Sequence, residues 1–198
     1  MGFQSEEGFV LKVIQIKEIL VVRHCMFLIG PPGSGKSATW KTLAKLYKNN
    51  GEECPTQIIN PKSVSPNELF GSITKGGEWC WGVMSTVMDH MSQAIEAYKT
   101  DQPHKWIILD GIVDTLWIES LNTVMDDNKV LTLVSNARIP LTDSMRLLFE
   151  VANLENATLA TVTRGGVLYI NSTDIGWKPY MDSWLDRAHY KVADKTSA

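Results

Sequence analysis

The chain has 198 residues, of which 44% are hydrophobic, and a formal net charge of -3 at pH 7. This length and composition can bury one sizeable core, and they favour a single domain over two. A nearly neutral chain without a clustered basic stripe argues against nucleic acid or an anionic membrane as a general partner.

The first third of the chain alternates helical and strand patterns. Residues 9–22 place apolar side chains on a stripe of mostly 3.6-residue period, which predicts a helix. The continuous apolar run at 25–30 predicts a strand covered on both faces. A glycine-rich turn follows, and then 37–50 shows helical spacing and ends in Asn-Asn-Gly. The run "TQIIN" at 56–60 is the next candidate strand.

The middle of the chain begins with a segment rich in Pro and Gly. Residues 60–79 are therefore expected to be mostly loop. Met and Ile recur at helical spacing over 81–99, which predicts a helix with Met in the core. Residues 106–110, "WIILD", predict a buried strand, and 116–127 looks helical.

The last third adds three β-rich segments. Two short arms around a Ser-Asn turn predict a hairpin at 129–141, and buried strands are expected at 145–151 and 166–170. Strands that alternate with helices over the whole length predict an α/β fold with a central, mainly parallel, five-stranded sheet flanked by helices. In this class, ligands lie at the carboxyl ends of the strands.

Neither a membrane span nor a disulfide framework is expected. The longest apolar run, "EILVVRHCMFLIG", is interrupted by charge and is shorter than the roughly 20 residues that a spanning helix needs. The start, "MGFQSEEGF", lacks the apolar stretch of a signal peptide. Cys25, Cys54 and Cys80 form no CxxC or Cys/His pair, so we expect reduced thiols in a cytoplasmic protein without a cysteine metal site.

The segment "GPPGSGKS" satisfies the GxxxxGK[ST] pattern of a phosphate-binding P-loop, and it lies between a predicted strand and a predicted helix as the mechanism requires. Its glycines allow successive N–H groups to face the β-phosphate of a nucleotide. Lys36 is expected at the β- and γ-phosphates, and the Ser37 hydroxyl on Mg²⁺. The candidate nucleotide-binding residues are Gly30, Pro31, Pro32, Gly33, Ser34, Gly35, Lys36 and Ser37.

The strand "WIILD" supplies the second half of such a site. Asp110 at its end is expected beside Ser37, as a ligand or orienting group of the Mg²⁺ shell. Hydrolysis also needs a group that positions the attacking water, often a Glu directly after this Asp. The residue in that position is Gly111, which has no side chain. Asp114 is an alternative acid, but N-capping of the following helix explains it as well.

Beyond the P-loop, long segments of the chain resemble the second AAA+ module of a dynein heavy chain. The likeness includes "VVRHCMFLIGPPGSGKS", "NPKSVSPNELFGSI", "KWIILDGIVDTLWIESLNTVMDDNKVLTL", "RIPLTDSMRLLFEVANLENATLATVTRGGVLYI" and "DIGWKPYMDSWL". It covers about residues 9–187, and "WIESLNTVMDDNKVLTL" and "LYINSTDIGW" are more similar to axonemal, outer-arm-type chains than to the cytoplasmic one.

The resemblance implies that 1–198 is one AAA+ nucleotide-binding module, in which 9–187 form the large α/β subdomain with an inserted β-hairpin and most of the helical lid subdomain is missing. Dynein heavy chains carry six such modules in one polypeptide, hydrolyse ATP mainly at the first, and move toward microtubule minus ends. The implied partners are neighbouring modules and, through other parts of the parent chain, microtubules and dynein intermediate and light chains. A cytoskeletal location is implied, in the axoneme of a cilium or flagellum.

Family resemblance also assigns roles to individual residues. The second module binds ATP or ADP with Mg²⁺ without turning it over, with Asp110 as the Walker B aspartate. Asn153 falls at the place of the sensor asparagine, and Asn136 is the rival candidate, although turn chemistry explains it. Arg164 falls where ring ATPases place an arginine finger that reaches the neighbouring module's γ-phosphate. Two alternatives stay open: an autonomous ATPase or remodelling enzyme of the MoxR or midasin type that hydrolyses ATP, and an interaction domain with a vestigial P-loop.

Overall fold

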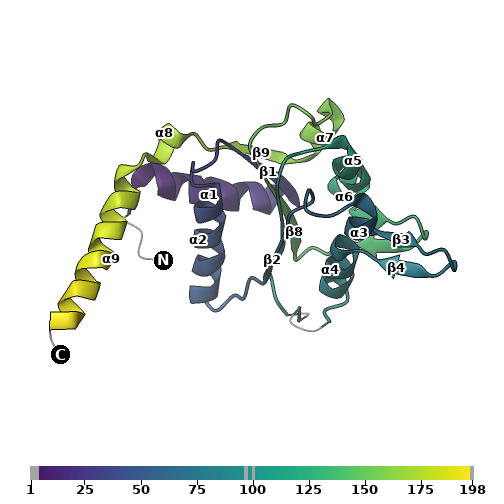
Figure 1. The fold of residues 1–198 in the computed structure, drawn as a ribbon, viewed down its shortest axis with the longest axis horizontal. Coiled ribbons are helices and arrows are strands. Elements are labelled where there is room, and N and C mark those ends of the chain that lie inside the picture. Colours follow the sequence, from purple (N-terminus) through teal and green to yellow (C-terminus); the bar gives the residue numbers. More distant parts are fainter. Residues whose placement is uncertain (1–4, 96–97, 100, 197–198) are drawn as a thin grey trace.

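The computed structural model describes residues 5–95, 98–99 and 101–196, and a central sheet with helices on both faces organises them (Figure 1). The elements in the first half are α1 (Glu7–Val22), β1 (Cys25–Ile29), α2 (Lys36–Asn49), β2 (Thr56–Ile59), α3 (Pro66–Phe70), β3 (Gly71–Ile73), β4 (Trp79–Trp81) and α4 (Val83–Ser92). Those in the second half are β5 (Lys105–Asp110), α5 (Thr115–Ile118), the 3-10 turn η1 (Glu119–Leu121), α6 (Asn122–Met125), β6 (Val130–Thr132), β7 (Arg138–Pro140), β8 (Met145–Val151), α7 (Leu159–Arg164), β9 (Gly166–Tyr169), α8 (Ser172–Ile175) and α9 (Lys178–Thr196).

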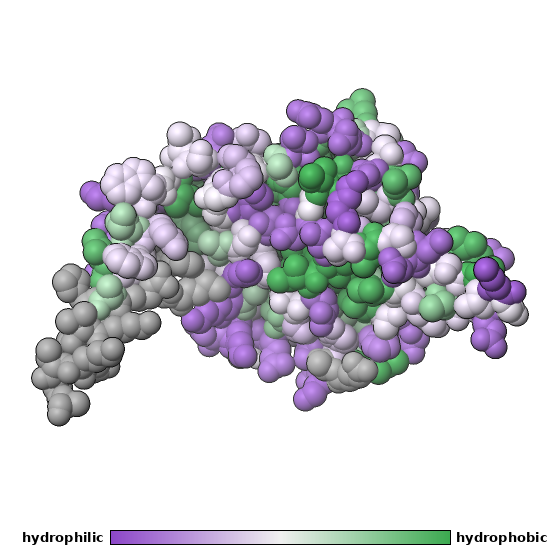
Figure 2. Space-filling view, in the orientation of Figure 1, coloured by the Kyte–Doolittle hydropathy of each residue, from purple (hydrophilic) through white to green (hydrophobic). Residues whose placement is uncertain are grey.

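The predicted five-stranded parallel sheet is confirmed. Its order is β2-β5-β8-β1-β9, and every neighbouring pair is parallel. The connection after β1 runs toward β2 at one edge of the sheet and the connection after β8 runs toward β9 at the other, so a topological switch point lies between β1 and β8, where the P-loop begins. Figure 2 shows apolar surface in the middle of the face that Figure 1 presents, around β2 and α3.

The two faces of the sheet bury different cores because side chains alternate along each strand. One face carries Cys25, Phe27, Ile107, Leu147 and Phe149, and α4, α5, α6 and the β6–β7 hairpin pack against it. The other face carries Met26, Leu28, Trp106, Ile108 and Leu148, and α1 and α2 cover it. Figure 1 shows this division, with α1 and α2 on one side of the sheet and α3 to α6 on the other.

In the described part of the chain, two hairpins lie outside the main sheet. The predicted one is confirmed as β6 paired with β7. The other pairs β3 with β4; α3, β3 and the first residue of β4 fall within residues 60–79, which were expected to be mostly loop, and these elements were not predicted. The cause is local: Ser65 and Glu68 form a capping box around Pro66, which starts α3. Gly71, with a φ of 111°, then turns the chain into β3.

Helix predictions were less accurate than strand predictions. The helix expected at 81–99 ends at Ser92, because Ala94 adopts a left-handed conformation with a φ of 56°. Residues 96–97 lie outside the described residues. The helix expected at 116–127 is three short pieces, α5, η1 and α6. Helices α7, α8 and α9 were not predicted. None of the helices among the described residues is long and apolar enough to cross a membrane.

Candidate functional site

The P-loop connects β1 to α2 at the carboxyl edge of the sheet. Gly33 and Gly35 have φ angles of 77° and 97°, a region that only glycine occupies at low cost. A Cβ at Gly35 would also lie 2.8 Å from Cδ1 of Ile175, so α8 closes tightly over the loop. The Ser34 hydroxyl is buried and has no hydrogen-bond partner among the described residues. The loop therefore presents backbone groups and one unsatisfied hydroxyl around a curled backbone.

Lys36 is the first residue of α2, and its side chain folds back over the loop. Its Nζ donates to the carbonyl oxygens of Gly30 at 2.8 Å and of Pro31 at 3.0 Å. The residue is 9% exposed. The ammonium group is thus held among the loop residues, where it can meet the phosphates of a nucleotide.

Ser37 is bound by an acid that the sequence analysis did not single out. Its hydroxyl donates to Oε1 of Glu150 at 2.5 Å, and the indole Nε1 of Trp40 donates to Oε2 of the same carboxylate at 2.9 Å. Glu150 is 7% exposed. The carboxylate therefore links β8 to the first two turns of α2, and both of its oxygens accept a hydrogen bond from that helix.

A usable signal for Glu150 was present in the sequence. It is the only charged side chain in "LLFEV", the carboxyl-terminal part of a strand that is buried on both faces. A charged residue in such a strand is rarely buried without a partner. Because Glu150 has the parity of Leu148, it faces α2, the helix that the P-loop starts.

Asp110 is the last residue of β5, and its backbone is in register with that of Glu150 on β8. Desolvation and the Glu150 charge raise the pKa of Asp110 above its usual value, whereas Lys36 and Lys41 oppose that rise. The structure thus brings the predicted P-loop residues and Asp110 to one edge of the sheet. It adds Glu150 as a second carboxylate.

Gly111 and Asp114 follow Asp110 on the way to α5. A Cβ at Gly111 would lie 3.1 Å from Oδ1 of Asn60. Asp114 is the N-cap of α5 and accepts the Leu116 N–H at 2.9 Å through Oδ1, while Oδ2 is ion-paired with Lys62. These bonds lower the pKa of Asp114, which makes it a weaker base. The N-cap interpretation is confirmed.

The two asparagine candidates differ in their surroundings. Asn136 has a φ of 64° in the β6–β7 turn, so turn chemistry accounts for it. Asn153 lies two residues beyond β8, at the edge of the sheet that carries Asp110, and its Oδ1 accepts the Glu155 N–H at 3.4 Å. Asn153 stays the sensor candidate by its place in the strand order.

Arg164 ends α7, on the face of the sheet opposite α2. Its Nε forms an ion pair with Asp126, just after α6, and one of its terminal nitrogens donates to the carbonyl oxygen of Ala160. Its side chain is 29% exposed. The guanidinium is thus tethered on the side of the module away from its own P-loop helix.

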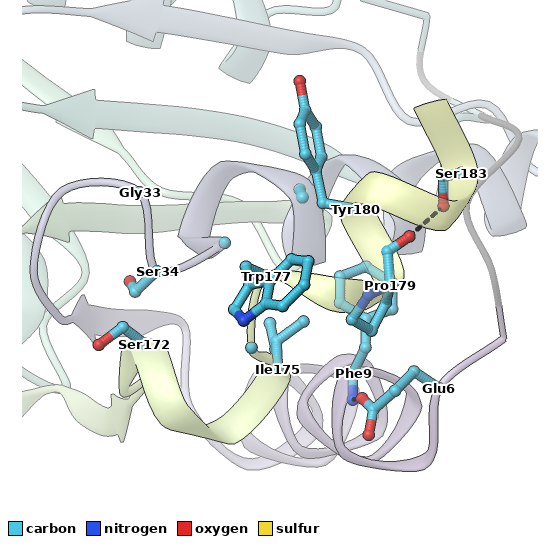
Figure 3. A pocket seen from close by; sticks show the side chains of 13 residues that line it. Glu6, Phe9, Gly33, Ser34, Ser172, Ile175, Trp177, Pro179, Tyr180 and Ser183 are labelled. Atoms are coloured by element: carbon cyan, nitrogen blue, oxygen red, sulfur yellow. Dashed lines mark hydrogen bonds between the residues drawn. The ribbon is translucent and has the colours of Figure 1, made fainter. Parts of the chain in front are cut away.

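A cavity of about 270 Å³ opens beside the P-loop. Its lining includes Gly33, Ser34 and Gly35 of the loop, Phe9 of α1, and Trp177 and Tyr180 near the start of α9 (Figure 3). Lys12 joins α1 to α8 and β9, with Nζ 3.0 Å from Asp174 and 2.9 Å from the Tyr169 carbonyl oxygen. Aromatic rings next to a phosphate cradle suit a ligand with a flat base at one end and phosphates at the other.

The residues present fit a magnesium nucleotide. Ser37, which is bonded to Glu150, and Asp110 offer the oxygen atoms that Mg²⁺ prefers, and the curled loop, Lys36 and the unsatisfied Ser34 hydroxyl suit phosphate oxygens. Such an arrangement, at the switch point of a parallel sheet of this order, defines a P-loop nucleotide-binding domain.

The chain belongs to the dynein-related subfamily of AAA domains: residues 25–164 match that family, described as "AAA domain (dynein-related subfamily)". It is 54% identical over 187 residues to "Dynein beta chain, ciliary" of Tripneustes gratilla, and 51% identical over 188 residues to "Dynein axonemal heavy chain 17" of Homo sapiens. Identity to "Dynein beta chain, flagellar outer arm" of Chlamydomonas reinhardtii is 47% over 188 residues.

Each of these matches covers 94% of this chain but 4% of the relative, so the chain corresponds to a small part of a dynein heavy chain. The resemblance to a dynein heavy chain of the axonemal type is therefore confirmed.

Proposed function

We propose that this chain is the second AAA+ module of an axonemal dynein heavy chain, and that it binds ATP or ADP with Mg²⁺ without hydrolysing it. The observation that carries the proposal is an intact P-loop, with Lys36 and Ser37 in place, beside a strand in which Gly111 follows Asp110. The module keeps the groups that hold phosphates and cation. It lacks the acid that usually positions water.

Binding would be shared among the groups already described. The 30–37 loop and Lys36 would hold the phosphates, and Ser37 and Asp110 would hold the cation, which when bound neutralises phosphate charge. The cavity between the loop and α9 would take the base, against Phe9, Trp177 and Tyr180. Asn153 would sense the γ-phosphate from the adjacent strand end.

Hydrolysis by this module has no assigned base. Asp114 is a poor substitute for the missing glutamate because the Leu116 N–H and Lys62 engage its two oxygens. This argues against the reading of the chain as an autonomous remodelling ATPase. We propose that this module instead supports ATP hydrolysis at the first module of the ring, to which Arg164 would supply a guanidinium.

Within the parent chain, the module would contact the AAA+ modules on either side. Microtubules and intermediate or light chains would bind elsewhere on that polypeptide, in the axoneme of a cilium or flagellum. The names of the relatives support this location, since they are ciliary, axonemal and flagellar dyneins.

Binding and turnover of ATP by the purified chain test the proposal. We expect saturable binding of a fluorescent ATP analogue in Mg²⁺ and negligible steady-state release of phosphate. A turnover above roughly 1 per second, which is within the range of working enzymes, would overturn the non-hydrolytic assignment. Absence of binding at millimolar nucleotide would overturn the assignment of the site.

A further inference from the structure

We infer that Glu150 is a positioning residue of the magnesium site, which orients the Ser37 hydroxyl so that its oxygen can bind the cation. The inference rests on the proposed function, because it concerns how the same site holds Mg²⁺. It starts from one observation: Ser37 donates to Glu150 at 2.5 Å, and Asp110 is not the acceptor of that bond.

The direction of this hydrogen bond decides what Ser37 can do. A serine hydroxyl has one proton and two lone pairs. When the proton is directed to Glu150, the lone pairs point away from that carboxylate and are available to a cation. Carboxylates that hydrogen-bond to a metal ligand commonly orient that ligand in this way, and their removal costs about 10–100-fold in metal affinity.

Trp40 holds the Glu150 carboxylate in the orientation in which it accepts the Ser37 hydrogen bond. Its Nε1 donates to Oε2 at 2.9 Å, so Glu150 cannot turn both oxygens toward the cation without losing that bond. Trp40 is 2% exposed and Glu150 is 7% exposed, so water does not replace either partner easily. Asp110, in register on the neighbouring strand, would hold the cation together with Ser37.

The substitution Glu150→Gln tests this arrangement because it keeps the shape and changes the hydrogen bonding. An amide has a single acceptor oxygen, but Glu150 serves two donors. If the oxygen faces the Trp40 N–H, the amide NH₂ donates to Ser37 and occupies the lone pair that Mg²⁺ needs. We therefore expect Glu150→Gln to weaken Mg²⁺ binding selectively, with little effect on nucleotide binding in the absence of Mg²⁺.

The measured quantity is the magnesium ratio: the Kd of a fluorescent ATP analogue in EDTA divided by its Kd in Mg²⁺. We expect Glu150→Gln to lower this ratio at least tenfold, largely because its Kd in Mg²⁺ is higher than that of the parent. Glu155→Gln, at an exposed position just beyond β8, is the matched control and should keep the parent ratio. Circular dichroism melting confirms that each variant is folded.

A rescue experiment separates positioning from a packing role. In the Trp40→Phe background the amide of Glu150→Gln has one donor left to serve, so its oxygen can turn to Ser37. The double variant should therefore recover most of the ratio measured for Trp40→Phe alone. Should Glu150→Gln not fold, Glu150→Asp, whose shorter carboxylate keeps the charge, must lower the ratio.

The outcomes are distinct. An unchanged ratio in folded Glu150→Gln, an equal loss of affinity in EDTA and in Mg²⁺, or absence of rescue by Trp40→Phe would each overturn the role of Glu150. A parent chain that binds no ATP analogue would overturn the proposed function itself, and is recognised before any variant is made.

Discussion

Asp114 is ion-paired with Lys62, and the same carboxylate caps the first turn of α5. This relationship predicts that Asp114 supports folding and not chemistry. Asp114→Ala should lower the thermal midpoint by a small, measurable amount, because the Leu116 N–H loses its partner. Asp114→Asn keeps a capping oxygen and should melt closer to the parent. Neither variant should alter phosphate release, and a drop in a measurable basal turnover would revive Asp114 as a catalytic acid.

Substitution of Lys36 tests whether the P-loop binds nucleotide. Lys36→Ala removes the ammonium group that lies on the Gly30 and Pro31 carbonyl oxygens, so affinity for a fluorescent ATP analogue should fall by at least a hundredfold, as expected for loss of a buried charged contact worth about 3 kcal/mol. Lys45→Ala, on the exposed side of the same helix, is the control. Equal affinities for the two variants would show that the loop is idle.

The missing side chain at Gly111 predicts that a carboxylate placed there would allow some ATP hydrolysis. Gly111→Glu places a carboxylate after Asp110, at the cost of a Cβ contact 3.1 Å from Asn60 Oδ1. We expect single-turnover hydrolysis of ATP to rise above the parent, yet to stay far below 1 per second because no finger from another module reaches this site. Gly111→Gln imposes the same crowding without a base. If Gly111→Gln hydrolyses as fast as Gly111→Glu, the missing carboxylate is not the cause of inactivity.

The proposed role of Arg164 predicts an effect on ATP hydrolysis at the neighbouring module. In the complete heavy chain, Arg164→Ala should slow hydrolysis at the first module by about a thousandfold with little change in nucleotide affinity there. Lys45→Ala serves again as the surface control. In the isolated chain, Arg164→Ala should leave ATP binding unchanged, since the guanidinium lies on Asp126 across the sheet from the P-loop. An unaltered motor ATPase rate would contradict the assignment.

The cysteines predict a labelling pattern. Burial raises the pKa of Cys54 to about 12 and raises that of Cys25 further, so both stay protonated at pH 8 and unreactive, whereas Cys80 is exposed. A thiol reagent should therefore modify one cysteine in the native chain and all three after denaturation. Rapid modification of Cys54 in the native chain would show that the segment before β2 opens.

Strands were predictable here because each carries its own signal. The runs "CMFLI" and "WIILD" are continuous apolar segments, which a sheet covered on both faces requires. Helix ends depended on single backbone conformations, such as the left-handed Ala94 that follows α4, and apolar periodicity does not report them. The capping box of Ser65 and Glu68 was readable as the pattern S-x-x-E, and it marks the start of the α3 that was expected to be loop.

Some residues of the candidate site could be recognised from a contiguous sequence motif, whereas others are brought together only by the fold. The P-loop motif is contiguous, and Asp110 follows a recognisable strand, so both could be identified from sequence. The partner that binds Glu150 through an indole nitrogen is Trp40, 110 positions away, and only the parallel pairing of β5, β8 and β1 brings them together. The cavity beside the loop likewise combines α1 with α9, which no local pattern joins.

That cavity has a mechanical consequence. Lys12 bonds the carbonyl oxygen of Tyr169, 157 positions away, and aromatic rings from α1 and α9 face the same space. In the proposed complex, a base bound there would contact residues of both α1 and α9, so tension applied to these two segments would be borne by the ligand as well as by the protein. Within the proposed dynein heavy chain, a module with bound nucleotide would then resist such tension better than one without it, although no bond in the nucleotide is broken.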